Sequence, residues 1–142
     1  MRLLARAPLA VLESWARRSG ESATLPARIW LRKPETGLVM LRACAGGAGE
    51  RFNLGEMTLT RCALRIETGE VGVAYVKGRS QRKAELSALA DALLQSATWR
   101  EAVRRRLIEP LRAQLEAAET RARHKAQATR VEFFTLAREA GE

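Results

Sequence analysis

Histidine, cysteine and aromatic residues are scarce in this 142-residue sequence. It contains one histidine, His124, and two cysteines, Cys44 and Cys62, and only 5% of its residues are aromatic. One histidine gives no basis for a Ser–His–Asp or Cys–His catalytic set. Two cysteines without CxxC spacing do not form a metal site. We therefore predict no catalytic residues and no metal site in this chain.

Long hydrophobic runs are also missing. No apolar run approaches the roughly 20 residues that cross a bilayer. Arg6, Pro8 and Glu13 interrupt the apolar residues near the start, so we interpret this segment as a short amphipathic helix and not as an export signal. The protein is expected in the cytoplasm, without membrane contact. There we expect Cys44 and Cys62 to be unpaired and buried on neighbouring strands.

Acidic residues are too few to balance the basic ones. The chain has 25 Lys and Arg against 16 Asp and Glu, a net charge of +9. The sheet region predicted below is neutral, and the excess lies in the flanking segments, residues 1–33 and 78–142. A basic surface attracts nucleic acid, nucleotides or an acidic protein. A basic nucleic-acid-binding module is therefore an alternative, although few aromatic residues are present to stack on bases. A free-standing enzyme that uses a nucleotide is a further alternative.

The hydrophobic pattern predicts an α+β fold in a single domain, residues 1–142. We expect an N-terminal helix in residues 1–20 and an antiparallel sheet in residues 27–77. A sheet-covering helix in residues 80–98 and an extended helical arm in residues 99–138 should follow, with a boundary or kink at Glu109-Pro110. In the N-terminal segment Leu4, Leu9, Leu12 and Trp15 can share a helical face, and Pro8 either begins the main helix or splits the segment in two. Alternation places four strands at residues 27–33, 38–45, 57–67 and 71–77. We expect a turn at residues 34–37 between the first two and a tight hairpin at residues 68–70 between the last two. The second strand is apolar on both faces, which argues against its being an exposed edge.

Two helical stripes are clear. Leu86, Leu89, Leu93 and Leu94 form an apolar face on a helix over residues 81–95, with Ser80 as its N-cap. In the arm, a thinner seam recurs at spacings of three and four and includes Leu111, Leu115, Ala118, Ala122 and Phe133. Because this seam is mostly alanine in its middle, we expect the arm to dock on, or swap with, another chain.

A glycine-rich loop contains Gly46, Gly47 and Gly49 and is followed by Arg51 and, further on, Glu56. Backbone N–H groups of such a loop could cradle phosphate. No Gly-Lys-Ser/Thr follows, so it is not a Walker A loop. The alternative is a hairpin loop whose glycines supply positive φ angles.

A second candidate anion site is the basic cluster Arg79, Arg82 and Lys83. Placed at a helix N-terminus, these cations oppose the helix dipole, which a bound phosphate or an acidic partner would offset. The alternative is a solvated cluster neutralised by Glu85.

Many short pieces in a fixed order carry a resemblance to a known family. They are Thr36-Gly37-Leu38-Val39, Gly46-Gly47-Ala48-Gly49, Phe52, Gly55-Glu56, Thr58-Leu59-Thr60-Arg61, Tyr75-Val76, Gly78-Arg79, Ala84-Glu85 and Val131-Glu132-Phe133-Phe134-Thr135. Over almost its whole length the chain resembles the PhnG family, small subunits of the bacterial carbon–phosphorus lyase system.

The resemblance implies a non-catalytic or accessory subunit in organophosphonate catabolism. The family's complex is a transferase that moves the ribose 5-triphosphate moiety of MgATP to an alkylphosphonate and releases adenine. The resemblance implies PhnI as the principal partner, with PhnJ and PhnH in a hetero-oligomer, and leaves open a contact between two PhnG copies. It implies no nucleic acid and no cofactor on this chain alone, with MgATP as a substrate of the assembled complex.

Overall fold

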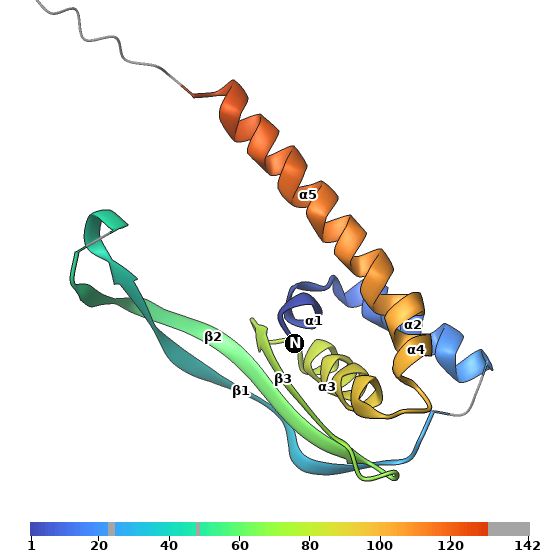
Figure 1. Ribbon diagram of the computed structural model, residues 1–142. Coiled ribbons are helices and arrows are strands. Elements are labelled where there is room, and N and C mark those ends of the chain that lie inside the picture. Colours follow the sequence, from blue (N-terminus) through green and yellow to red (C-terminus); the bar gives the residue numbers. More distant parts are fainter. Residues whose placement is uncertain (23–24, 48, 131–142) are drawn as a thin grey trace, which may run out of the picture. The chain divides into compact units, whose positions relative to one another are not determined.

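The computed structural model describes residues 1–22, 25–47 and 49–130 and confirms an α+β fold. Its elements, in order, are α1 (Arg2–Arg6), α2 (Leu9–Ser22), β1 (Arg28–Cys44), the 3-10 turn η1 (Ala45–Gly47), β2 (Arg51–Ile66), β3 (Val71–Lys77), α3 (Gln81–Gln95), α4 (Arg100–Val103), the π-helical turn η2 (Arg104–Ile108) and α5 (Glu109–Ala128) (Figure 1). The chain divides into two compact units, Met1–Arg112 and Ala113–Glu142.

The sheet has three antiparallel strands in the order β1-β2-β3, so the prediction of four strands is wrong. The two expected strands at residues 27–33 and 38–45 are one long strand that continues through Pro34. A proline is tolerated at position 34 because β1 lies at the sheet edge. Its pairing with β2 is also irregular between Arg32 and Glu35, so the missing N–H group of Pro34 removes no regular ladder bond. Gly37 has no positive φ angle and pairs with Leu59, so no turn forms there.

The turn between β2 and β3 is the tight hairpin that the sequence predicts. Gly69 has a φ angle of 104°, which a residue with a side chain rarely adopts. Its N–H donates to the Ile66 carbonyl, and the Ile66 N–H donates to the Glu70 carbonyl. The three strands therefore form a meander with short connections.

One face of the sheet packs on α3 and forms the core. Cys62, Leu64 and Ile66 of β2 point to this face and are buried, as are Leu86, Leu89 and Leu93 of α3. Gly72 of β3 lies so close to the helix that an added Cβ would be 1.9 Å from the Ala88 carbonyl oxygen. Each buried leucine contributes about 1.5–3 kcal/mol before conformational entropy is subtracted. The predicted helix over residues 81–95 is confirmed, with the bounds of α3.

The N-terminal segment is split at Pro8 into α1 and α2, one of the two outcomes that the sequence left open. Leu4, Leu12 and Trp15 are buried, as their shared helical face predicts. Helix α2 continues past Gly20 to Ser22, so the expected end at residue 20 is two residues too early. No atom outside the helix lies within 4 Å of the position a Gly20 Cβ would take, so neither packing nor backbone strain at Gly20 ends the helix.

In the described part of the helical arm, the helix changes from a π-helical turn to an α-helix just before Pro110. Proline there lacks the N–H for the bond to the carbonyl four residues earlier, and its ring crowds that carbonyl. The π-helical turn η2 precedes it and α5 begins at Glu109, so the predicted boundary at Glu109-Pro110 is confirmed. Leu111 is buried in the first unit.

Within the described residues of the second unit, the chain forms the remainder of α5. Leu115, Ala118 and Ala122 of the predicted seam lie on it, whereas Phe133 lies outside the described residues. Across the described helices, none combines the length and apolarity of a bilayer-spanning segment. The expectation that this arm docks on another chain stays a prediction.

Candidate functional site

The most unusual feature of the first unit is the outer half of the β1–β2 hairpin, here called the distal ribbon (residues 38–44 and 51–58). Strand β3 ends at Lys77, opposite Leu59, so beyond this point the sheet has two strands (Figure 1). Gly78, with a φ angle of 90°, turns the chain away, and its N–H donates to the Thr58 carbonyl at 2.9 Å. The turn at Gly78 therefore fixes where the ribbon begins.

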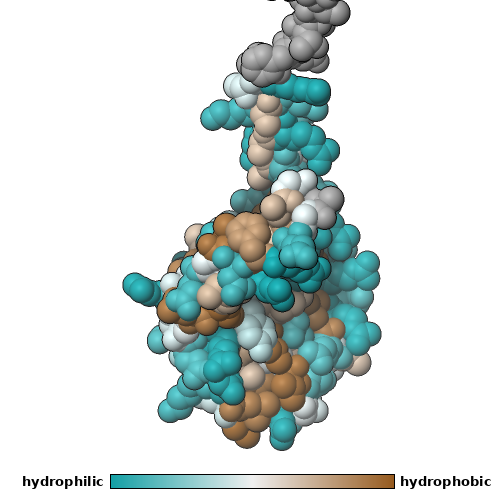
Figure 2. All heavy atoms as spheres, turned by 90° about the vertical axis from the view of Figure 1, so that its left-hand side faces the viewer, coloured by the Kyte–Doolittle hydropathy of each residue, from teal (hydrophilic) through white to brown (hydrophobic). Residues whose placement is uncertain are grey.

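Both faces of the distal ribbon carry exposed apolar side chains. In an antiparallel pair, opposite residues share a face. The register thus places Val39 and Met57 on one face, with Leu41 and Phe52 further along it. Leu38 and Met40 lie on the other face and are 62% and 50% exposed. Leu54 is the extra residue of a bulge between Leu41 and Arg42. Figure 2 looks onto this end of the unit and shows apolar patches among hydrophilic ones.

This exposure overturns the expectation that residues 38–45 form an inner strand, because β1 is an edge strand. The residue pattern itself indicates burial on both faces. A two-stranded hairpin is marginal in water, and clustered exposed apolar residues mark interaction surfaces. The arrangement is therefore typical of an interaction surface.

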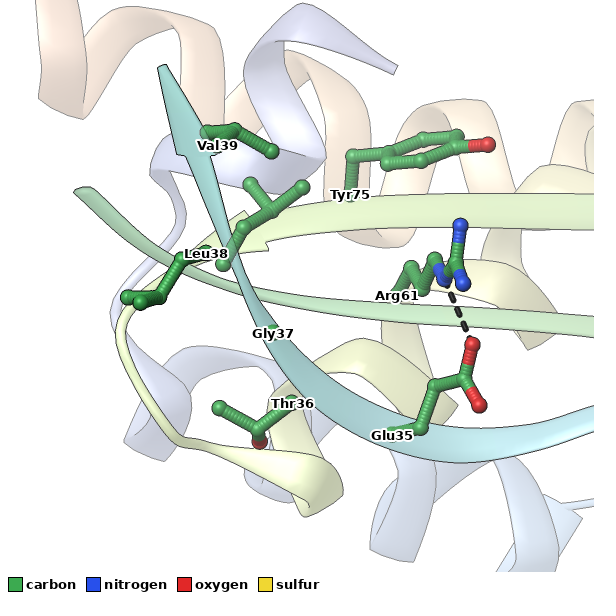
Figure 3. A pocket seen from close by; sticks show the side chains of 8 residues that line it. Glu35, Thr36, Gly37, Leu38, Val39, Arg61 and Tyr75 are labelled. Atoms are coloured by element: carbon green, nitrogen blue, oxygen red, sulfur yellow. Dashed lines mark hydrogen bonds and ion pairs between the residues drawn. The ribbon is translucent and has the colours of Figure 1, made fainter. Parts of the chain in front are cut away.

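A shallow pocket of about 320 Å³ lies on the uncovered face of the sheet, where the ribbon begins (Figure 3). One of its walls is apolar and includes Val39 and Leu59. At its other side the Glu35 carboxylate accepts hydrogen bonds from Arg32 Nη1 at 2.5 Å and from Arg61 Nε at 2.6 Å. These two bonds lower the pKa of Glu35. The sequence does not indicate this ion-pair group, because a turn at residues 34–37 would place Glu35 outside the sheet.

The glycine-rich loop is the tip of the hairpin. Gly46 has a φ angle of 58°, and a Cβ on Gly49 would lie 2.6 Å from the Ala45 carbonyl oxygen. The hairpin-loop interpretation is therefore confirmed. Gly47 belongs to the same turn, Arg51 opens β2 opposite Cys44, and Glu56 lies further down the ribbon opposite Met40. Phosphate binding by this loop stays a prediction.

The basic cluster lies at the start of α3. Ser80 caps the helix, its Oγ accepting the Lys83 N–H at 3.3 Å. Glu85 pairs with Arg82 at 2.8 Å and with Arg28 at 2.6 Å. Neutralisation by Glu85 is thus found for Arg82, whereas Arg79 and Lys83 have no ion-pair partner among the described residues. Burial lowers the pKa of Lys83.

The structure does not bring the two predicted anion sites together. The cluster follows Gly78 at the base of the ribbon, and the glycine loop is at its tip. Six residue steps of strand, from 38 to 44, separate them along β1, which is about 20 Å. They cannot cradle one small anion jointly.

The two cysteines differ in environment. Cys62 is buried in the core, and burial raises the pKa of its thiol to about 11. Cys44 is exposed near the hairpin tip, so the expectation that it is buried is wrong. The same extension of the hairpin that exposes Leu38 and Met40 exposes Cys44. In the part of the chain that the structure describes, no three His, Cys, Asp or Glu side chains group as metal ligands.

Comparison with known proteins gives a consistent result. Residues 1–139 match the family described as phosphonate metabolism protein PhnG. The chain is 45% identical over 139 residues to the alpha-D-ribose 1-methylphosphonate 5-triphosphate synthase subunit PhnG of Rhizobium meliloti (strain 1021), covering 97% of this chain and 86% of that relative. The match spans the sheet, the ribbon and both sets of helices. The chain therefore belongs to the PhnG family of phosphonate metabolism proteins.

Proposed function

We propose that this chain is an accessory, non-catalytic subunit of a multi-subunit ribose 1-alkylphosphonate 5-triphosphate synthase, the transferase of a carbon–phosphorus lyase complex. The complex would transfer the ribose 5-triphosphate moiety of MgATP to an alkylphosphonate with release of adenine. MgATP would be a substrate of the assembled complex and not a ligand of this chain alone.

The observation that carries the proposal is the distal ribbon. Its apolar side chains stand on both faces, and five of its large hydrophobic residues are at least 37% exposed: Leu38, Met40, Leu41, Phe52 and Leu54. Surface of this kind is stable in water when another protein covers it. A relative that is 45% identical carries the name of a synthase subunit, which supports the same role.

Within the complex, we propose PhnI as the principal partner, with PhnJ and PhnH in the same hetero-oligomer. The reaction would then take place on the partners, and this chain would hold them in position. The proposed division of labour fits the ribbon, which offers contact area and, among the side chains that commonly transfer protons, only Glu56 and Cys44.

Co-expression tests the proposal. An affinity-tagged copy of this chain is co-expressed with PhnI, purified, and passed through gel filtration. We expect the two to elute together, at a volume earlier than that of either alone. A tagged chain that elutes by itself as a stable monomer, with PhnI in a separate peak, would contradict the proposal. So would turnover of MgATP and an alkylphosphonate by the isolated chain.

A further inference from the structure

We propose that the distal ribbon binds an acidic partner protein by strand addition. An extended segment of the partner pairs with the open edge of β1 at residues 38–41, and the partner's apolar side chains cover the two faces of the ribbon. This inference rests on the proposed function, because it describes how that subunit contact is made.

The direction of the backbone groups follows from one hydrogen bond. The Thr58 carbonyl accepts the Gly78 N–H, so the polar backbone groups of Thr58 point toward the β3 side, away from β1. Thr58 is directly opposite Leu38. In an antiparallel ladder, two opposite residues point their N–H and C=O groups either toward each other or both away. The backbone groups of Leu38 therefore point outward from the sheet, and by the two-residue period those of Met40 do too.

The other described edges are less suited to a new strand. The outer edge of β3 is already engaged by α3, because the Asp91 carboxylate accepts the Val73 N–H at 3.1 Å and Gln95 Nε2 donates to the Val71 carbonyl at 2.7 Å. The inner half of β1 contains Pro34 and two irregularities. These are devices that discourage edge pairing.

Residues 38–41 have neither a proline nor an irregularity in their pairing. Their pairing with β2 is regular, from Leu38 opposite Thr58 to Leu41 opposite Gly55, and the four side chains are uncharged and apolar. An uncharged, regular, apolar edge is the type that accepts a partner strand. Main-chain hydrogen bonds would give affinity, and Leu38 and Met40 on one face with Val39 and Leu41 on the other would give specificity.

Charge decides between a second copy and a different partner. The first unit, Met1–Arg112, contains twenty basic and eleven acidic residues and so carries the whole net charge of +9. The hairpin from 38 to 58 is neutral, with Arg42 and Arg51 against Glu50 and Glu56. Two copies joined by their ribbons would bring two strongly basic bodies toward each other, which like-charge repulsion opposes.

An acidic partner is attracted to this basic unit instead. Arg79 is exposed and has no ion pair among the described residues. It follows Gly78 on the β3 side of the ribbon's base, opposite the open edge of β1, so an acidic rim would reach it only on a partner that also covers a face of the ribbon. The first unit thus combines a neutral, apolar distal ribbon with a basic remainder, which is complementary to an apolar groove with an acidic rim.

The test compares two substitutions at Met40 in the co-expressed synthase complex. Met40→Ala removes the side chain and keeps the outward N–H group. Met40→Pro removes both, and the β1–β2 ladder keeps its bonds because that N–H points away from β2. We expect Met40→Ala to weaken association with the partner by up to about tenfold. Met40→Pro should weaken it by a further tenfold or more, since main-chain pairing is lost as well.

Thermal unfolding of both variants alone checks that the first unit stays folded. Equal association of Met40→Pro and Met40→Ala would overturn strand addition.

The acidic character of the partner is tested by salt. Association of the wild type with the partner should weaken at least tenfold between about 50 and 500 mM salt. Association that does not change with salt would overturn the proposal that the partner is acidic. If the wild type forms a homodimer that Met40→Pro dissociates, a second copy of this chain, and not an acidic partner, pairs with the edge of β1. A wild-type chain that joins no co-expressed subunit would instead refute the proposed function.

Discussion

Substitution of Gly72 by alanine should destabilise the first unit by moving α3 off the sheet. A Cβ at this position would be 1.9 Å from the Ala88 carbonyl oxygen, 2.6 Å from the Ala92 nitrogen and 2.9 Å from the Ala92 Cβ. Two of these atoms are helix backbone, so no flexible side chain can give way. Overpacking typically destabilises by 1–3 kcal/mol, and a backbone clash places Gly72→Ala at about 3 kcal/mol.

Thermal unfolding followed by far-ultraviolet circular dichroism measures this effect. For a unit of this size, about 3 kcal/mol corresponds to a fall in Tm of roughly 12 °C. The matched control is Gly20→Ala in α2, where nothing lies within 4 Å of the added Cβ. That variant should keep or slightly raise the Tm, because alanine favours a helix by about 0.5–1 kcal/mol over glycine. If the two variants melt within a degree of each other, the close packing of α3 on β3 is refuted.

Three further predictions address the hydrogen bonds, thiols and charges. Thr60→Val should destabilise by about 1–3 kcal/mol in urea unfolding, because the buried Thr60 hydroxyl donates to the Gly78 carbonyl at 2.6 Å. Alkylation followed by mass spectrometry should modify the exposed Cys44 at least about tenfold faster than Cys62, whose pKa is raised to about 11 by burial; equal rates would contradict the fold. The pKa of Glu35 is held below its usual 4.5 by hydrogen bonds from two arginines, so its stabilising effect is present above pH 4.5 and is lost as the pH falls through the lowered value. The free energy of unfolding of the wild type should therefore fall more than that of Glu35→Gln between about pH 5 and pH 3. If the two free energies fall in parallel over this range, the ion pairs of Glu35 contribute nothing to stability.

The elements with a strong local signal were predictable from the sequence. Helix α3 has a four-leucine stripe and a serine cap, and the helical periodicity over residues 81–95 matches its bounds, whereas the broader range 80–98 extends three residues past its end. The tight turn at Gly69 was also predicted, because glycine between two alternating strands is a local signal. The helix boundary before Pro110 follows in the same way from the missing N–H group.

The number of strands was not predictable, because it depends on pairing over a distance. Pro34 and Gly37 in sequence resemble a turn, and only the register with β2 shows that β1 continues through them. The same error hid Glu35 and Arg61, which meet across the two strands. Local pattern cannot supply a cross-strand contact whose register is unknown.

The two-faced hydrophobicity of residues 38–45 predicts an inner strand if apolar residues are assumed to be buried within their own chain. In the structure the strand is an exposed edge. The pattern thus indicates an interface, and a partner is needed to account for it.

Amide hydrogen exchange at β1, with the chain alone and in the purified synthase complex, tests the docking of the ribbon most directly. The outward N–H groups of Leu38 and Met40 should exchange quickly in the isolated chain and at least about tenfold more slowly in the complex, while those of the buried strand β3 change little. Equal exchange at Leu38 and Met40 in the two states would contradict the account, because the ribbon would then be as open in the assembly as it is alone.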